Sequence, residues 1–594
     1  MVPFMCFVVL ASAVPGTLAD CDSVVSNTGG WNGGWQGKFD VPVTNNVNGW
    51  TLKVNFDSPI SEFEQWSVNT VSSGSRSVTL GGIQYWNDNL VAGSTLSFDF
   101  LYRFSGNQIP KITSVEFNGQ NLCGGSNAGS QVTEAPEPTT EAGPVVPAVT
   151  ADPSPAVSKC NAKYDYDEAL EKSLLFYEAQ RSGPLPEDQR VTWRKDSGVN
   201  DHGFHNGKKV DLSGGYYDAG DFVKFGFPMA GTATILAWGA IDYKGAYTNA
   251  GELDNVKSSV KFATDWFLKA HVAPNVLFGQ VGNGKLDHDS WGRPEDMTMA
   301  RPAYKIDTNN PGSDLAGETA AALAAASILF DGSDPEYSAE CLKSAKELYK
   351  FANKYRGKYS DAITDAAIYY KSWGGYNDEL AWAAAWLYRA TNETKYLTQA
   401  ESHYKKLVTP NEFSWDDKTA GVQVLLAKLT NKNKYKTATK AFCDDVINNK
   451  QRTPKGLVFF AKWGPLRYSA NAAYICLQAA DLGLKPSAYR SFACKQIHYM
   501  LGDAGRSFLI GFGKNYPQRP HHRSSSCPTT GTCDWNSYKV NGPNPQLLVG
   551  ALVGGPDAHD NYNDDRDDYL ANEVTTDYNA GFQSAVAALR QTCS

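Results

Sequence analysis

Two different hydrophobic patterns divide the chain. Residues 21–123 contain short runs in which apolar and polar residues alternate, separated by Gly, Asn and Ser, and helical periodicity is almost lacking. Alternation with a period of two is typical of strands that bury one face. The pattern therefore predicts a small β-sandwich, with strands over 38–43, 50–56, 77–80, 95–102 and 113–117.

From Cys160 onward the pattern becomes helical. Ala and Leu recur at helical spacing, and Gly-, Pro- and Trp-rich connections such as 279–313 and 502–563 separate the periodic segments. Successive helical hairpins of this kind fit an α-solenoid, a bundle or a closed toroid, and periodicity does not choose among them. The clearest helices are expected over 315–330, 379–389, 420–429, 471–482 and 577–590.

Two segments follow neither pattern. Residues 124–158 are rich in Pro, Thr, Ala and Glu and hold no aromatic residue, so they cannot bury enough apolar surface to fold and are expected to form an extended linker. Residues 1–19 form an apolar run that ends in small residues, which is typical of a secretory signal peptide. No later stretch reaches the roughly 18 apolar residues that a membrane helix needs. We therefore expect a secreted, extracellular protein with domains at 20–123 and 159–594.

Composition narrows the class of partner. Aromatic residues make up 12% of the chain, including 15 Trp and 30 Tyr, and flat rings bury the C–H faces of sugars, although large cores use aromatic residues too. The formal net charge of −8 argues against nucleic acid and anionic membrane surfaces as partners. Nothing in the sequence indicates an obligate oligomer, so we expect a monomer.

The cysteines indicate an oxidising compartment. Ten of the eleven remain once the signal segment is removed, and none of them forms a zinc-type CxxC pair, which favours disulfides over metal ligation. Cys21 and Cys123 bracket the predicted sandwich and are expected to pair, and Cys527 and Cys533 are near enough to close a small loop. Asn392 begins an Asn-Glu-Thr glycosylation sequon.

Two acidic segments, far apart in the sequence, carry the candidate chemistry. Residues 211–225 set three aspartates among aromatic residues and glycines, and residues 557–577 hold eight acids and one base. Crowded acids repel one another, which raises carboxyl pKa values and marks a functional site. Glycoside hydrolysis uses two such carboxyl centres, one protonated and one ionised. The acids alone leave a calcium site or a solvated acidic loop as alternatives.

Three longer motifs resemble one enzyme family. The stretch DLSGGYYDAGDFVKFGFPMA (211–230) looks like the N-terminal catalytic segment of family 9 glycoside hydrolases, the inverting cellulases, and 507–523 and 562–580 resemble the same family. The resemblance runs from about Cys160 to the end of the sequence. It implies a closed (α/α)6 barrel whose loops build an open cleft, and endo-hydrolysis of β-1,4-glucosidic bonds in cellulose and soluble β-glucans with inversion.

The resemblance also implies residue roles. Asp221 is the expected general base, Asp218 helps to hold the water, and Glu573 is the expected general acid, kept protonated by apolar neighbours. Asp218 and Asp221 are three residues apart, so a helical turn would present both on one face. Inversion predicts that Glu573 and Asp221 stand roughly 6.5–9.5 Å apart. His521 and Asp564 are expected to assist, and the expected substrate-binding residues are Arg523, Trp291, His288, Trp373, Tyr376, Trp463 and Arg467.

Some relatives in the family carry a structural calcium near the segment 312–318. Ser313 and Glu318 offer oxygen ligands that suit a hard cation, with Asp361 from a later loop. Gly317 stands where some relatives have an acid, so one ligand is missing. Any calcium is expected to be structural, because inversion with a carboxylate base needs no cofactor.

The N-terminal segment 21–123 resembles family 2 carbohydrate-binding modules, through its Trp-Asn-Gly-Gly-Trp run at 31–35 and its later tryptophans. Trp35 stands where that family usually has Phe. Trp50 begins an alternating strand and is expected in the core. The tryptophans expected to form a flat cellulose-binding strip are Trp31, Trp66 and Trp86.

Three other functions stay open at this point. A non-catalytic cellulose-binding protein could keep the barrel, although the intact Asp218, Asp221 and Glu573 argue against it. An exo-acting relative would need a loop that walls off one end of the cleft, and loop shape is not readable from the sequence. Retaining hydrolysis is excluded only by the resemblance.

Overall fold

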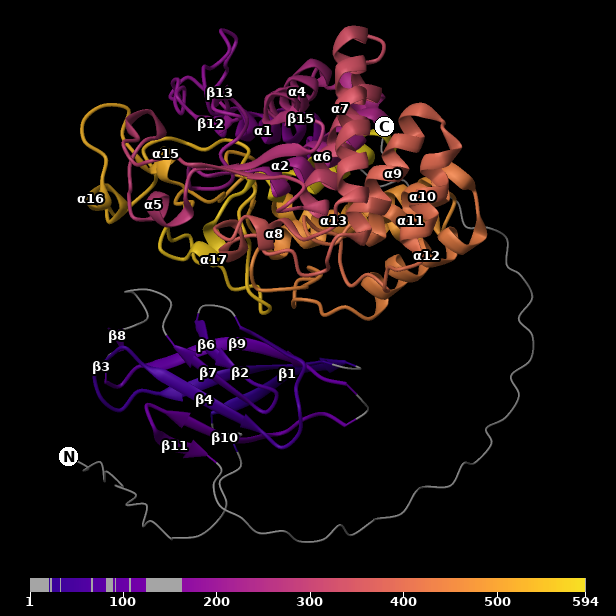
Figure 1. The fold of residues 1–594 in the computed structure, drawn as a ribbon. Coiled ribbons are helices and arrows are strands. Elements are labelled where there is room, and N and C mark those ends of the chain that lie inside the picture. Colours follow the sequence, from indigo (N-terminus) through magenta and orange to yellow (C-terminus); the bar gives the residue numbers. More distant parts are fainter. Residues whose placement is uncertain are drawn as a thin grey trace, which may run out of the picture. The chain divides into compact units, whose positions relative to one another are not determined.

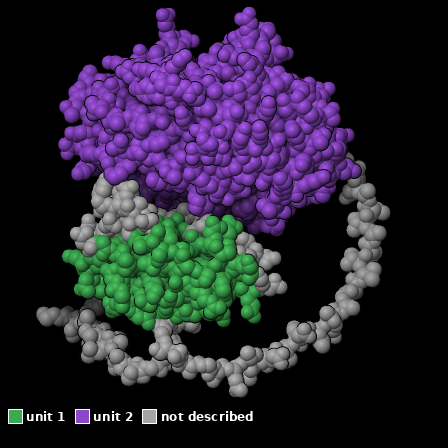
Figure 2. Space-filling model, viewed as in Figure 1, with its two compact units in different colours: residues 1–149 green, residues 150–594 purple. Residues whose placement is uncertain are grey.

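The computed structural model describes residue 21 and residues 24–31, 34–65, 68–81, 89–90, 92–105, 108–123 and 163–592. The chain divides into two compact units, Met1–Val149 and Thr150–Ser594 (Figure 2). The predicted signal segment 1–19 and linker 124–158 lie outside the described residues.

Unit 1 is a sandwich of antiparallel strands (Figure 1). One sheet has the order β1-β2-β9-β5 and the other β11-β10-β4-β7-β6, with a short β3-β8 pair beside them. The five strands expected from the sequence are all confirmed. The strands are β1 (Val25–Trp31), β2 (Gly34–Pro42), β3 (Val47–Asn48), β4 (Thr51–Phe56), β5 (Glu62–Gln65), β6 (Asn69–Ser73), β7 (Ser77–Gly81), β8 (Asn89–Leu90), β9 (Thr95–Arg103), β10 (Ile112–Phe117) and β11 (Gln120–Cys123).

Alternating burial explains how these strands pack. In β4, Leu52, Val54 and Phe56 are buried and the residues between them are exposed or half-buried, so one face of the sheet closes the core. Trp50 is buried beside them, as expected. The predicted disulfide between Cys21 and Cys123 is confirmed. Two of the tryptophans expected to bind cellulose, Trp66 and Trp86, lie outside the described residues. For the third, Trp31, the structure describes only the backbone.

Unit 2 is a double ring of helices (Figure 1). The inner helices contact one another in the closed order α2, α6, α9, α11, α13, α18 and back to α2, and α1, α4, α7, α10, α12 and α14 pack outside them. The (α/α)6 barrel is therefore confirmed. The long helices are α1 (Tyr166–Ala179), α2 (Gly226–Asp242), α4 (Leu253–Ala270), α6 (Ser313–Phe330), α7 (Pro335–Lys354), α9 (Asn377–Thr391), α10 (Thr394–Tyr404), α11 (Thr419–Thr430), α12 (Asn433–Asn448), α13 (Pro465–Asp481), α14 (Pro486–His498) and α18 (Thr576–Thr592).

The sequence separates the two rings by composition. The inner helix α2 buries every residue from Gly226 to Ala240, and small residues let its neighbours approach from all sides. The outer helix α4 buries positions three or four apart, such as Val256, Val260 and Ala263, and exposes the opposite face. Among the described helices, α6 alone is long and apolar enough to span a membrane, but 94% of it is buried inside the unit. It is a core helix of the barrel.

Short elements connect the helices at the end of the barrel where the acidic motifs lie. β14 continues directly from the first acidic segment and pairs with β16, which leads into α5. The short elements at this end are α5 (Gly284–His288), α8 (Tyr359–Ala362), α15 (Arg523–Ser526), α16 (Trp535–Tyr538), α17 (Tyr569–Asn572), the 3-10 turns η2 (Pro294–Asp296) and η3 (Ala366–Ile368), the π turn η4 (Tyr499–Asp503), and the strands β12 (His202–His205), β13 (Lys208–Asp211), β14 (Lys224–Phe225), β15 (His271–Ala273), β16 (Val276–Val281) and β17 (Ala303–Ile306). The short helix α3 (Lys244–Asn249) follows the carboxyl end of α2, at the opposite end of the barrel.

Disulfides also brace unit 2. The predicted Cys527–Cys533 bond closes a small loop, and Cys443–Cys476 joins α12 to α13. Cys341 of α7 departs from the expectation of disulfides, because it is a buried free thiol.

Candidate active site

The first acidic segment forms a tight turn before α2. Asp218 and Asp221 do not lie on a helical turn, because this stretch is irregular. The Asp218 N–H donates to Val223 O (3.0 Å), and the Asp221 carboxylate accepts from Ala219 N (3.1 Å) and Val223 N (3.4 Å). The backbone amides around Asp221 therefore hold its side chain inside the turn, as an Asx-type loop does.

Burial and crowding perturb both carboxyl groups. Burial raises the pKa of Asp218 well above its usual range, and repulsion from Asp221 adds to the effect. Asp218 Oδ2 accepts from the Tyr370 hydroxyl, and Oδ1 is buried with no partner among the described residues. Burial raises the pKa of Asp221 to about 7, with a contribution from Asp287 and an opposing one from Arg523.

Glu573 directly follows the short helix α17. Its Oε2 accepts from Trp463 Nε1 (2.6 Å) and from the Tyr578 hydroxyl (3.1 Å). Burial raises the pKa of Glu573 to about 7, and these two hydrogen bonds oppose that rise. Because Oε2 already accepts two hydrogen bonds, a proton on this carboxyl belongs on Oε1.

Backbone hydrogen bonds join the three motifs. His521 N donates to Asn572 O (2.9 Å), which fixes the histidine segment beside Glu573. Arg523 N donates to Gly220 O (3.2 Å), which fixes the same segment beside Asp221. A Cβ on Gly220 would lie 2.3 Å from His521 O, so only glycine allows this approach. The fold thus brings together Asp221, His521 and Glu573, which the sequence places far apart.

His521 offers a hydrogen-bond acceptor to the site. Its Nδ1 lies 2.8 Å from Arg566 O, so Nδ1 must carry a hydrogen. Burial is the main cause that lowers the pKa of His521 to about 4, so the ring is neutral at working pH. Nε2 is then unprotonated and can accept a hydrogen bond. His522 lies away from this position, since its Nε2 contacts Gln180 Oε1.

Arg523 is committed to an ion pair inside the protein. It is 4% exposed, and its Nη1 donates to Asp287 Oδ2 (2.7 Å) and Asp287 O (2.8 Å). Asp287 Oδ1 in turn accepts from Phe222 N (3.1 Å), the residue that follows Asp221. The sequence analysis missed Asp287, although it directly precedes His288, one of the expected substrate-binding residues. Arg523 and Asp287 together support the turn that holds Asp221.

Asp564 accepts hydrogen bonds from the backbone of the segment before His521. Its two carboxylate oxygens accept from Gln518 N (2.8 Å) and Arg519 N (2.9 Å). These amides lie just before His521, so Asp564 orients the segment that delivers the histidine.

Three of the other expected substrate-binding residues lie near the acids, two on the side of Glu573 and one beside Tyr369. Trp463 is 44% exposed and touches Glu573, and Arg467 is buried and pairs with Asp577 (2.9 Å). His288 is exposed on the other side of the site, where its ring stacks on Tyr369.

Two expected residues lie further along the loop that supplies Tyr370. Trp373 is exposed and its N–H donates to Asp416 (3.0 Å), and Tyr376 is half-buried just before α9. Trp291 differs from the expectation, since it is only 6% exposed.

The residues expected to bind calcium do not fit that ion. Glu318 is fully buried, and its carboxylate accepts from Thr234 Oγ1 (2.9 Å) and lies 3.6 Å from the Lys418 ammonium. The Ser313 hydroxyl donates to Ala352 O (2.9 Å), and Asp361 is exposed on α8. A lysine cation therefore occupies the position next to Glu318 that a metal would need.

One other group of described residues has metal-ligand spacing. Ligand atoms of Asp221, Asp287 and His288 lie within 4.8 Å of one another. The Arg523 guanidinium already neutralises Asp287, and His288 Nδ1 lies 2.8 Å from Gly284 O. The group therefore forms part of an ion-pair network around Asp221.

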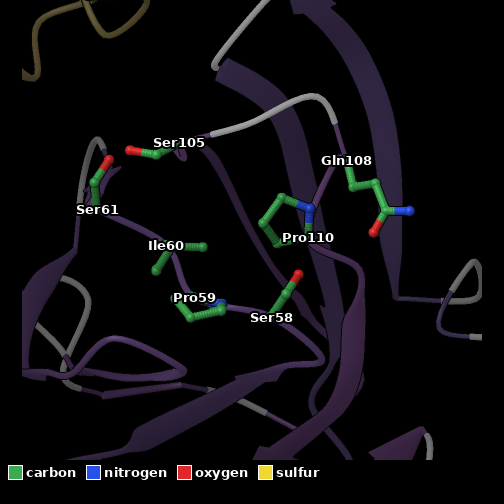
Figure 3. Close-up of a pocket in the computed structure, with 7 residues that line it drawn as sticks. All are labelled: Ser58, Pro59, Ile60, Ser61, Ser105, Gln108 and Pro110. Carbon is green, nitrogen blue, oxygen red and sulfur yellow. The ribbon is translucent and has the colours of Figure 1, made fainter.

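Two surface pockets have linings that do not include the carboxyl groups of the site. One, of about 550 Å³ in unit 1, is lined by Ser58, Pro59, Ile60, Ser61, Ser105, Gln108 and Pro110 (Figure 3). The other, of about 620 Å³, lies between the outer helices α4 and α7 and the segment 211–215. The first has no titratable side chain in its lining, and neither contains a residue of the acid pair.

Comparisons with known proteins show which family the helical unit resembles. The model of glycosyl hydrolase family 9 matches residues 166–586. Endoglucanase B of Cellulomonas fimi is 49% identical over 447 residues, which is 72% of this chain but only 42% of that protein. Endoglucanase 19 of Arabidopsis thaliana is 46% identical over 470 residues, 72% of this chain and 74% of its own.

Solved structures show the same likeness. The endoglucanase of the termite Nasutitermes takasagoensis has a TM-score of 0.71 and 62% identity, over 72% of this chain and 99% of that one. The cellulase Cel9M of C. cellulolyticum, solved with cellobiose, has a TM-score of 0.67 and 36% identity over the same shares. Residues 20–133 match a different model, described as the N-terminus of the serine protease gd.

Proposed function

Because the chain belongs to glycosyl hydrolase family 9, we propose that it is a secreted endo-1,4-β-glucanase that cuts internal bonds of cellulose and soluble β-glucans with inversion. Relatives named endoglucanases support this substrate class, and the disulfides support secretion. The observation that carries the proposal is the pair Asp221 and Glu573. Their pKa values are both raised to about 7, but backbone amides stabilise one carboxylate and indole and phenol donors contact the other.

Asp221 is the base in this mechanism. The amides of Ala219 and Val223 favour its carboxylate form, which takes a proton from water as the water oxygen attacks the anomeric carbon. Asp218 holds that water, since its buried Oδ1 has no hydrogen-bond partner among the described residues. Inversion follows because the attack and the departure occur on opposite faces of the sugar.

Glu573 is the acid. Its Oε1 proton passes to the departing O4 as the C1–O4 bond breaks, and the carboxylate that forms is stabilised by Trp463 and Tyr578. His521 accepts from a sugar hydroxyl through Nε2. Arg523 and Asp564 act one step away, by supporting Asp221 and the His521 segment. Catalysis by this pair uses no cofactor.

We further propose that residues 20–123 are a cellulose-binding module, joined by the linker 124–158 to the catalytic domain 159–594. The β-sandwich closed by Cys21–Cys123 supports this reading. The expected binding strip is Trp31, Trp66 and Trp86. Replacing these tryptophans by Ala in the full chain should abolish sedimentation with microcrystalline cellulose and leave hydrolysis of soluble glucan intact. Retention on cellulose by the triple variant would contradict the proposal.

Proton NMR of cellohexaose during hydrolysis tests the catalytic proposal. Early α-anomer from internal cuts supports the inverting pair, and Asp221→Asn or Glu573→Gln should remove it. Early β-anomer would refute single displacement, and glucose as the sole early product would indicate an exo-acting enzyme. Folded protein that binds cellulose without any product would indicate a non-catalytic binding protein.

A further inference from the structure

A loop covers the tryptophan that the sequence assigned to the substrate. The Trp291 indole donates to Ser526 Oγ (2.9 Å), and its ring centroid lies 4.5 Å from Tyr538 and 5.5 Å from Trp535. Only 6% of Trp291 remains exposed, whereas Trp535 is 40% exposed. The accessible aromatic surface at this position is therefore that of Trp535.

The loop that carries Trp535 is held in place at several points. Cys527–Cys533 closes its first part, and Arg293 donates to Pro528 O (2.8 Å) and Gly531 O (2.6 Å). Arg566 donates to Tyr538 O (2.6 Å) and Val540 O (3.0 Å) at its other end. In Figure 1 the short helix α16, which bears Trp535, lies at the periphery of unit 2 near α5 and α15. A loop so anchored presents a rigid surface.

The orientation of Trp535 itself is also set. Its Nε1 donates to Asp289 O (3.2 Å). The amino end of α16 is capped by a capping box between Asp534 and Ser537. A fixed indole that is part buried and part exposed loses little conformational entropy when a ligand stacks on it.

Ring contacts connect Trp535 to the catalytic acid. The Trp535 ring contacts Trp291, and the Trp291 ring contacts His521 with their centroids 5.6 Å apart. His521 in turn contacts Tyr569 (centroids 6.0 Å apart), and Tyr569 contacts Trp463 (5.5 Å). Trp463 in turn donates to Glu573. The exposed members of this row are Trp463, Tyr569 and Trp535. Exposed rings on one continuous row that passes the acid suit an extended glucan chain, because its sugar units present C–H faces at a regular repeat.

We propose that Trp535, not Trp291, is the platform on which a glucosyl unit of a bound β-1,4-glucan stacks at this end of the site. The inference rests on the proposed function, and it defines a subsite formed by the disulfide-closed loop. Trp291 is the buried support of that platform. Trp535 thereby helps to set which bond of an oligosaccharide is placed at the catalytic pair.

The test compares Trp535→Ala and Trp535→Phe in the full chain, using cellotriose to cellohexaose labelled at the reducing end. Loss of one stacking contact should lower kcat/KM on cellohexaose roughly five- to tenfold, mainly through KM. The change on cellotriose should be less than twofold, and the main cleavage position in cellohexaose should move. Trp535→Phe should restore most of the loss. Phe204→Ala, which removes another exposed ring on β12, is the matched control and should change nothing.

Equal losses on all chain lengths would overturn the inference, since they would indicate that the loop collapses and disturbs His521. Unchanged kinetics and cleavage pattern in Trp535→Ala would overturn it as well. In both cases the wild-type protein still cuts cellohexaose internally, so the proposed function stands. Absence of cleavage by the wild-type protein would instead refute the proposed function, and the subsite with it.

Discussion

Replacement of Asp287 by Asn should widen the pH range of activity toward acid. The Asp287 carboxylate lies within 4.8 Å of that of Asp221, and two unit charges at that distance repel by about 3.5 kcal/mol at an effective dielectric constant of 20. At about 1.4 kcal/mol per pKa unit, repulsion at this separation corresponds to about 2.5 pKa units. Asn keeps an oxygen for Phe222 N but carries no charge, and Arg523 then acts on Asp221 unopposed.

The sign follows from the role of the base. Asp221 must be ionised to accept a proton, so activity falls as pH drops through its pKa. Without Asp287 that pKa decreases, and the acidic limb of kcat/KM should move down by about 1 to 2 pH units, since structural relaxation, solvent and the Arg523 cation weaken the repulsion. The other charged and titratable groups around Asp221 are Asp218, Glu573, Arg523, His288 and Tyr369, and they are unchanged.

The assay is the pH dependence of kcat/KM on cellohexaose from pH 4 to 9, with both limbs fitted as properties of the coupled acid–base pair. Asp289→Asn, an exposed neighbour that pairs with Lys285 (2.7 Å), is the matched control and should leave both limbs in place. An acidic limb that stays fixed or moves up in Asp287→Asn would refute the view that Asp287 sets the charge state of the base.

Three further changes follow from the same structure. Lys418→Met should destabilise the protein by about 3–5 kcal/mol in urea unfolding, because it leaves buried carboxylates without their cation; EDTA should leave the wild-type Tm unchanged, and a chelator-induced drop would reveal a structural metal. Gly220→Ala should reduce kcat at least tenfold by pushing the histidine segment away, whereas Gly332→Ala, with open space around it, should have no effect on turnover; equal activities would disprove the required close approach. Trp463→Phe removes a hydrogen bond that lowers the pKa of the catalytic acid, so the basic limb of the pH profile should move up, and a downward shift would contradict the assignment.

The local helices and strands and the catalytic motifs could be predicted from the sequence alone. Ala and Leu at helical spacing predicted helices such as 315–330, and alternation predicted the strands of the sandwich, because each element depends on its own periodicity. The positions of Asp221 and Glu573 were accessible for the same reason, since each lies in a short motif. Closure of the inner ring of helices could not be predicted from periodicity. It requires α18 to contact α2, more than three hundred residues away, and no local pattern encodes that contact.

Only the tertiary structure decided which side chains face one another. Arg523 was expected at the sugar, but its partner Asp287 lies 236 residues away in the sequence. Glu318 was expected at calcium, but it faces Lys418, the residue just before the inner helix α11. Such pairings depend on the summed geometry of several elements, so the sequence determined which chemical groups were present, and the fold determined their charge states and partners.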